Sequence, residues 1–220
     1  MADTLPIVSV FDLVSGIIAL LVSYYAFSAR RLIASSVLSA LSFGFMLLGA
    51  ALLVEVVTNL SLGITAAAAS TSRTFVLLED LAYLVLQLAA FLIIAGGYAR
   101  MAYGGAGLAS GVLAALKPRA AQLAGAALLL YYLFLGLEFA ILLTLVFIIF
   151  QGFLVYTRSR DRSAFLVMLA FALIFLGHVV VLRSILDISG VEYLVAAAIQ
   201  FLGFLSLLAF VVRSGRVGSA

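Results

Sequence analysis

Five polar residues stand within otherwise apolar stretches of the chain, and their types suit the binding of a small polar solute or a cation. They are Glu79, Gln87, His178, Glu192 and Gln200. Carboxylates attract cations, glutamine amides both donate and accept hydrogen bonds, and histidine changes its charge near physiological pH. Because polar groups are costly in an apolar environment, each is a candidate for a ligand-binding role.

Each candidate also has a structural explanation. An acidic residue at the start of a helix favours the helix dipole by ~0.3–1 kcal/mol. A glutamine between helices can form a hydrogen bond of ~1 kcal/mol, and a neutral histidine can bond to a carbonyl group. In the functional alternative the acids form a vestibule for a cation or proton, to which Asp12, Glu55 and Glu138 contribute. We expect Arg183 to pair with Glu192 or Asp187.

Catalytic chemistry is poorly represented in the sequence. The chain has no cysteine and one histidine, which excludes disulfides, cysteine nucleophiles and thiolate or multi-histidine metal sites. No Ser-His-Asp set is defined by spacing. We therefore expect no enzyme activity, no catalytic residues, no metal and no cofactor.

The composition indicates an integral membrane protein. The 220 residues are 67% apolar and 10% charged, with a mean hydropathy of +1.36, whereas a soluble domain is about half apolar and a quarter charged. The N-terminus lacks the basic region of a signal peptide, so its apolar stretch is predicted to be a mature helix. The net charge of +3 is spread over several loops, which argues against nucleic-acid binding. The absence of cysteine and the excess of Arg over Lys are thermophile-like.

The apolar runs predict a single domain of seven transmembrane helices, with ~20 residues needed for each crossing. The expected spans are 7–28, 32–57, 75–99, 118–135, 137–157, 163–183 and 191–213. Residues 119–157 would form one helix of ~58 Å, nearly twice the ~30 Å hydrocarbon core, and would bury Glu138. A tight turn at Gly136, which places Glu138 at the surface, is the expected solution.

The charges predict the orientation in the cell membrane. With the N-terminus outside and the C-terminus inside, ten of twelve basic residues lie inside and eight of nine acidic residues lie outside, as the positive-inside rule requires of the basic ones. Only Arg73 and Arg183 are basic residues on the outer side. At the inner face, Arg158, Arg160 and Arg162 are expected to meet anionic membrane lipids or a partner protein.

The first and last three helices resemble each other. Glu79, Gln87 and Arg100 correspond to Glu192, Gln200 and Arg213, each offset by 113 residues. Other residues of the two triplets correspond at a different offset, because the loop at 58–74 is longer than its counterpart. This indicates a parallel 3+1+3 arrangement with repeat 1 at 7–100, a linker helix within 101–136 and repeat 2 at 137–214.

This arrangement resembles in topology the SWEET sugar transporters, and microbial rhodopsins have a similar seven-helix plan. The resemblance to the transporters implies a ligand site between the two triplets. Rhodopsins hold retinal on a lysine of the seventh helix, and residues 191–213 contain none, so retinal binding is rejected.

Small residues predict close helix contacts. Ser36, Ala40 and Gly44 form a row on one helix face, and Gly96-Gly97 is a second candidate. Asn59 begins a glycosylation sequon, but it lies very close to the end of its expected helix.

The sequence therefore predicts a non-enzymatic multi-pass membrane protein. It is expected to bind or transport a small solute or ion through an outward-facing polar pocket between the two helix triplets. The alternative is a membrane sensor or a structural subunit of a larger membrane complex.

Overall fold

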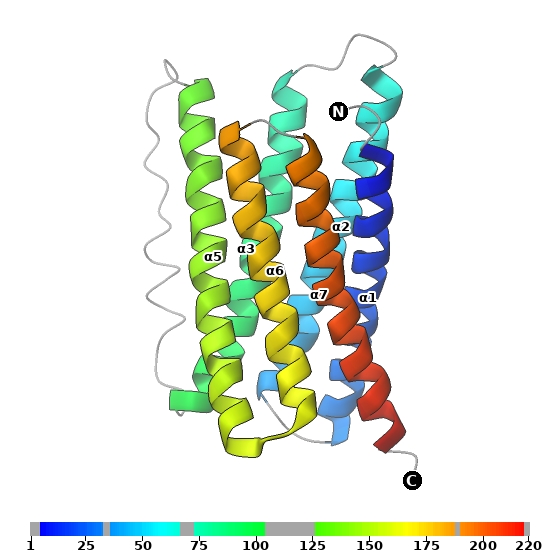
Figure 1. The fold of residues 1–220 in the computed structure, drawn as a ribbon, viewed down its shortest axis with the longest axis vertical. Helices are drawn as coiled ribbons and strands as arrows, with labels where there is room; N and C mark the ends of the chain where they lie inside the picture. Colours follow the sequence, from blue (N-terminus) through cyan, green and yellow to red (C-terminus); the bar gives the residue numbers. More distant parts are fainter. Residues whose placement is uncertain (1–4, 33–35, 67–72, 104–125, 188–189, 218–220) are drawn as a thin grey trace.

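Six long α-helices make up the described part of the chain. The computed structural model describes residues 5–32, 36–66, 73–103, 126–187 and 190–217. The helices are α1 (Leu5–Leu32), α2 (Ser36–Ala66), α3 (Arg73–Tyr103), α5 (Ala126–Ser159), α6 (Arg162–Asp187) and α7 (Gly190–Val217). They stand side by side along the long axis of the molecule (Figure 1).

All six helices are apolar and long enough to cross a membrane. Each contains a candidate span of 23 to 28 residues, and ~20 residues suffice for one crossing. Large apolar side chains such as Phe139, Leu143 and Phe150 of α5 lie exposed on the outside of the bundle, where only lipid can cover them. The chain is therefore a multi-pass membrane protein, but the described residues form six helices and not the seven that the sequence predicts.

The predicted break at Gly136 is wrong. Helix α5 runs unbroken from Ala126 to Ser159, and a side chain added at Gly136 would meet nothing within 4 Å. Residues 126–135 of the expected fourth helix are thus the first part of α5, while 118–125 lie outside the described residues. The length of α5 does not require a break, because a helix of 34 residues can tilt or project beyond the bilayer. The burial argument failed because Glu138 has a partner inside the bundle.

The predicted loop at 58–74 is also largely helical. Helix α2 continues to Ala66 and α3 begins at Arg73. The hydroxyl of Thr58 donates to the carbonyl of Val54 within the same helix at 3.0 Å, a bond that lets a polar residue stay in a helix interior. Asn59 lies inside α2 with its side-chain nitrogen shielded from solvent, so the sequon offers no exposed acceptor there.

The turn between α5 and α6 lies wholly within the described residues, with α5 ending at Ser159 and α6 beginning at Arg162. Arg160 has a φ of 50°, a left-handed conformation that commonly ends helices, and its N–H donates to the Tyr156 carbonyl at 2.7 Å. Asp161 then caps α6 by accepting a hydrogen bond from the Ser163 N–H at 3.0 Å. The turn confirms the predicted boundary between these two helices.

The helices form a closed ring. Neighbours pack in the order α1, α2, α3, α5, α6, α7, and α7 packs against α1. Helices α1, α3, α5 and α7 begin at one end of the bundle, whereas α2 and α6 run in the opposite direction (Figure 1). Helices α3 and α5 therefore run in the same direction, and the residues between them lie outside the described part.

The two ends of the ring carry opposite charges. The end at which α1 begins, here called the acidic end, holds Asp12, Glu55, Asp80, Glu138 and Glu192. The other, here called the arginine end, holds Arg30, Arg100, Arg158, Arg162 and Arg213. The predicted separation of charge is confirmed for these residues. By the positive-inside rule the arginine end is expected on the inner side.

Close helix contacts occur at small residues for which they were predicted. A Cβ atom at Gly44 of α2 would collide with Ile94 of α3, and one at Gly97 of α3 would collide with Ala40 of α2. Small residues let backbones approach where lipid provides no hydrophobic drive for association. At Gly96 a Cβ atom would meet nothing within 4 Å, so Gly96 has no packing role.

Candidate functional site

Three polar side chains from three helices form a hydrogen-bonded chain inside the ring. His178 Nδ1 of α6 lies 2.9 Å from Glu138 Oε2 of α5. On the other side of the imidazole, His178 Nε2 lies 3.1 Å from Gln87 Nε2 of α3. The three side chains are almost completely buried, with exposed fractions of 2% or less. The edge-on ring of Phe91 closes the site from α3, with its centroid 6.2 Å from that of His178.

The partners determine where the histidine proton lies. An amide nitrogen can only donate, so Gln87 Nε2 donates to His178 Nε2, which must therefore be the unprotonated ring nitrogen. The ring proton is then on Nδ1 and is donated to Glu138. The arrangement holds a neutral histidine beside a carboxylate, and it explains how Glu138 can be buried: the imidazole N–H replaces part of its lost hydration.

A second group of polar side chains lies toward the acidic end and is centred on Glu55 of α2. The hydroxyl of Tyr193 of α7 donates to Glu55 Oε1 at 2.8 Å, and Tyr83 of α3 also hydrogen bonds to the Glu55 carboxylate. Asp12 of α1 is close enough for its charge to act on Glu55, and His178 is close enough to do the same. We call these residues together with Gln87, Glu138 and His178 the polar network, and every described helix contributes to it.

The polar network is rich in carboxyl groups and incompletely satisfied. It contains three carboxyl groups, and no Lys or Arg belongs to it. Three of its shielded oxygen atoms have no hydrogen-bond partner: Asp12 Oδ2, Glu55 Oε2 and Gln87 Oε1. Buried acceptors normally have partners, and uncompensated buried charge is costly. The network therefore favours an added cation or proton.

The residues of the polar network are not arranged as a site for a multivalent metal ion. Within the described chain, no three His, Asp or Glu side chains are arranged to hold a metal ion. The carboxylates instead accept hydrogen bonds from tyrosine hydroxyls and an imidazole. These donors suit a site that exchanges protons or holds a singly charged group.

The structure brings three of the five predicted site residues together. Gln87 contacts His178, and Gln200 of α7 packs against Gly177, the residue before His178. The two glutamines thus approach the same turn of α6 from α3 and α7, although no hydrogen bond joins them. Glu192 lies at the rim, with its Oε1 3.3 Å from Arg183 Nε, which confirms the predicted ion pair. The side chain of Glu79 lies outside the described residues.

Glu138, Tyr83 and Tyr193 were not among the predicted site residues. The sequence analysis placed Glu138 at a turn. The tyrosines near helix ends are typical of the membrane interface, but these two point inward to Glu55. One signal was available: the only histidine of the chain, within an apolar helix, needs a polar partner, and few polar residues lie at its depth.

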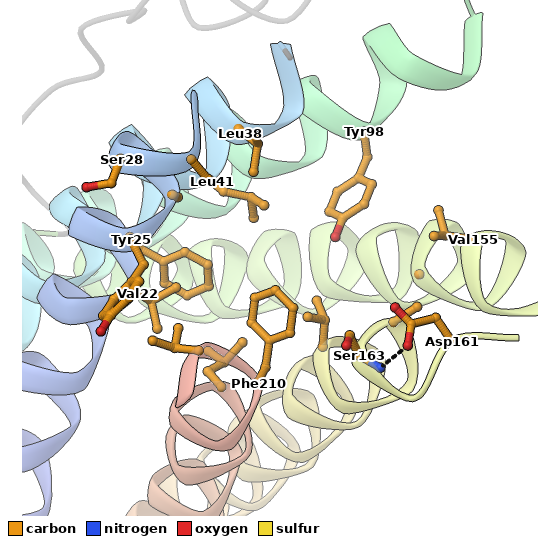
Figure 2. A pocket seen from close by; sticks show the side chains of 18 residues that line it. Val22, Tyr25, Ser28, Leu38, Leu41, Tyr98, Val155, Asp161, Ser163 and Phe210 are labelled. Atoms are coloured by element: carbon orange, nitrogen blue, oxygen red, sulfur yellow. Dashed lines mark hydrogen bonds between the residues drawn. The ribbon is translucent and has the colours of Figure 1, made fainter. Parts of the chain in front are cut away.

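A hollow of about 450 Å³ lies in the opposite half of the bundle and is lined by residues of all six helices. Its lining is mostly apolar, with side chains such as Val22, Leu41 and Phe210, and the hydroxyl of the buried Tyr98 points into it (Figure 2). Such a volume is within the usual range of small-molecule sites. It lies at the arginine end, whereas the sequence analysis expected a polar pocket at the outer face.

Three buried aromatic residues separate this cavity from the polar network. Phe45 lines the cavity and lies 6.0 Å, between ring centroids, from Phe171, and Phe91 contacts His178. Each is at most 1% exposed. On α2, α3 and α6 they stand between the residues of the cavity and those of the network. They therefore form an aromatic layer between the two regions.

Comparison with known proteins adds no assignment. No protein-family model matches the chain, and no curated protein and no solved structure match it either.

Proposed function

We propose that the chain is a non-enzymatic membrane protein that binds or moves a small solute or ion along the axis of the helix ring. The polar network at the acidic end is the proposed ion or polar-ligand site. The cavity at the arginine end is the proposed binding space for a solute. The aromatic layer between them acts as the barrier.

One observation carries the proposal: all six described helices direct polar side chains into one network that is rich in carboxyl groups and contains shielded oxygen atoms without partners. A merely structural network would be expected to satisfy its members. Ionisable groups inside a membrane bundle generally mark ion or substrate pathways.

The helix directions support the predicted internal repeat, which we include in the proposal. Helices α1 and α5, α2 and α6, and α3 and α7 run in matching directions (Figure 1). The contact of α3 with α5 has its counterpart in the contact of α7 with α1. A parallel pair of triplets would place the cavity and the network on the axis between them.

Charge displacement in proteoliposomes tests the proposal. Purified protein is adsorbed on a supported membrane and exposed to a rapid rise of Na⁺, with N-methylglucamine as the replaced cation, or to a rapid fall in pH. We expect a transient current in at least one of these jumps, because the cation enters a shielded site. The double variant Asp12→Asn/Glu55→Gln should abolish it.

Thr157→Val is the control, since it removes an exposed hydroxyl at the arginine end of α5, outside the polar network. The current should persist in that variant. Wild-type currents no larger than those of empty liposomes, or currents unchanged in the double variant, would contradict the proposal. A stoichiometric protein partner in mild detergent together with absent currents would favour the sensor or subunit alternative.

A further inference from the structure

We propose that the ion bound by the polar network is a proton, held at His178 beside Glu138, and that the side-chain amide of Gln87 reverses when the proton binds. This inference rests on the proposed function for its transport role and deepens it by naming the ion. The proton site itself stands on the geometry of three buried side chains.

The arrangement seen in the structure is the proton-free state of the site. Glu138 accepts the Nδ1 proton of a neutral imidazole, and Gln87 donates to Nε2. The pair of Glu138 and His178 then carries one negative charge. Both side chains are nearly inaccessible to solvent, and a lone charge in such surroundings is costly.

Proton uptake removes that charge and requires no additional space between the side chains. A proton from water adds to the lone pair of His178 Nε2 and gives an imidazolium beside the Glu138 carboxylate, a pair with no net charge. The proton on Nδ1 can remain there or cross the 2.9 Å bond to Glu138. In either case Nε2 carries a hydrogen and now needs an acceptor.

The side-chain amide of Gln87 can supply this acceptor. Its Nε2 cannot accept a hydrogen bond, so the amide must rotate by about 180° and present Oε1 to His178, since an amide carries its donor and its acceptor on opposite branches. In the proton-free state this same Oε1 is a shielded atom with no partner. The rotation would therefore satisfy the oxygen that is left unsatisfied in the structure.

Titratable and charged groups of the neighbouring helices lie around this site. Besides Glu138 of α5, the acidic groups that act on this part of the bundle are Glu55 of α2, Asp12 of α1 and Asp80 of α3. The hydroxyl of Tyr193 of α7 donates to Glu55, and Tyr83 of α3 acts on the same carboxyl group. On α6 itself, Arg183 pairs with Glu192 of α7 at the rim.

A metal cation fits this position less well than a proton. The contacts of 2.9 and 3.1 Å leave no space for an ion between the three side chains. The imidazole also presents its N–H, and not a lone pair, to the carboxylate. The proton is the ion whose binding these contacts accommodate.

Nitrogen NMR of the single histidine tests the proposal directly. The chain contains one His, so ¹⁵N-histidine labelling of the whole protein in lipid nanodiscs reports only His178. At high pH we expect the signature of a neutral ring with its proton on Nδ1. As the pH falls through the range of about 5 to 8 in which histidine titrates, both ring nitrogens should become protonated. The Gln87 side-chain amide signals, assigned by their loss in Gln87→Leu, should shift over the same range.

Variants separate the proton site from ordinary histidine titration. Glu138→Gln keeps an acceptor for Nδ1–H but removes the charge, and it should weaken proton binding by about tenfold or more. Thr157→Val, at the arginine end of α5, should leave the titration unchanged. Folding of each variant is checked by its helical circular dichroism and by its elution as a single species.

Two results would overturn the proposal: His178 signals that do not change between pH 5 and 8, or a titration that is the same in Glu138→Gln and wild type. Should Glu138→Gln fail to fold, the wild-type titration and the Gln87 amide response are decisive on their own. Proton binding without any current in the proteoliposome experiment would retain the proton site and refute the transport function.

Discussion

His178 and Glu138 stabilise each other at a depth where neither would be favourable alone. The carboxylate replaces lost hydration with an imidazole N–H at 2.9 Å, and the histidine gains a fixed tautomer. Removing one partner of a buried pair generally costs more than replacing both with apolar groups. That asymmetry gives a test of the pair that is independent of transport.

His178→Leu should lower the free energy of unfolding by about 3–5 kcal/mol, because Glu138 is left buried without its donor. The double variant His178→Leu/Glu138→Leu should recover much of this loss. Thermal unfolding of the three proteins measures these differences.

Equal stability of the single and double variants would show that the His178–Glu138 contact has been misjudged. Glu192→Gln is an instructive comparison. Its contact with Arg183 lies at the surface, where the Arg183 side chain is 71% exposed, so the change should cost less than ~1 kcal/mol.

Individual residues were partly predictable from the sequence. Gln87, His178 and Gln200 stand out because polar residues are rare in these apolar helices, and the structure gathers them around one turn of α6. The buried position of Glu138 beside His178 was not predicted, because a carboxylate two residues after a glycine is typical of a turn. Its burial depends on a partner 40 residues away, which no local pattern encodes. Tyr83 and Tyr193 were likewise assigned to the membrane interface from their position near helix ends alone.

At the scale of the helices, the apolar runs predicted most elements and the pattern of charges predicted their directions. The exceptions are the boundaries. Helices α2 and α3 extend into the expected loop, and α5 passes through the expected turn. Hydropathy indicates which residues can lie in lipid. It does not define where a helix ends, because a helix continues beyond the bilayer where its backbone stays hydrogen bonded.

Gly136→Ala tests the continuity of α5. In a continuous helix the change should leave stability unchanged or raise it by up to ~1 kcal/mol, since alanine favours helices over glycine. Nothing lies within 4 Å of the added methyl group. A turn with a left-handed glycine would instead be destabilised by alanine. Thermal unfolding of the variant measures the sign, and a clear loss of stability would restore the predicted break.

Adjacent glycines of α3 provide a matched test of the contact with α2. Gly97→Val should destabilise the bundle by ~1–3 kcal/mol, because the side chain would collide with Ala40, whose methyl group cannot move without its helix. Gly96→Val makes the same chemical change on the open face of α3 and should have little effect. Thermal unfolding of both variants measures the difference, and equal losses would indicate that α2 and α3 do not approach as closely as described.

At the scale of the whole molecule, the polar network depends on α3 and α5 running in the same direction. Gln87 lies in the half of α3 nearer its start, and Glu138 lies in the half of α5 nearer its start. If these helices were antiparallel, Glu138 would be at the other end of the bundle from Gln87, and His178 could not contact both. The network, the proposed proton site and the proposed repeat would all fail together.

Single-cysteine labelling measures this direction, and the absence of native cysteines makes every label unambiguous. Met101→Cys lies near the end of α3, and Ala126→Cys lies at the start of α5. A membrane-impermeant maleimide applied to intact cells and to inverted vesicles should label these two positions from opposite sides, with Ala126→Cys reacting from outside. Labelling of both positions from the same side would contradict the account.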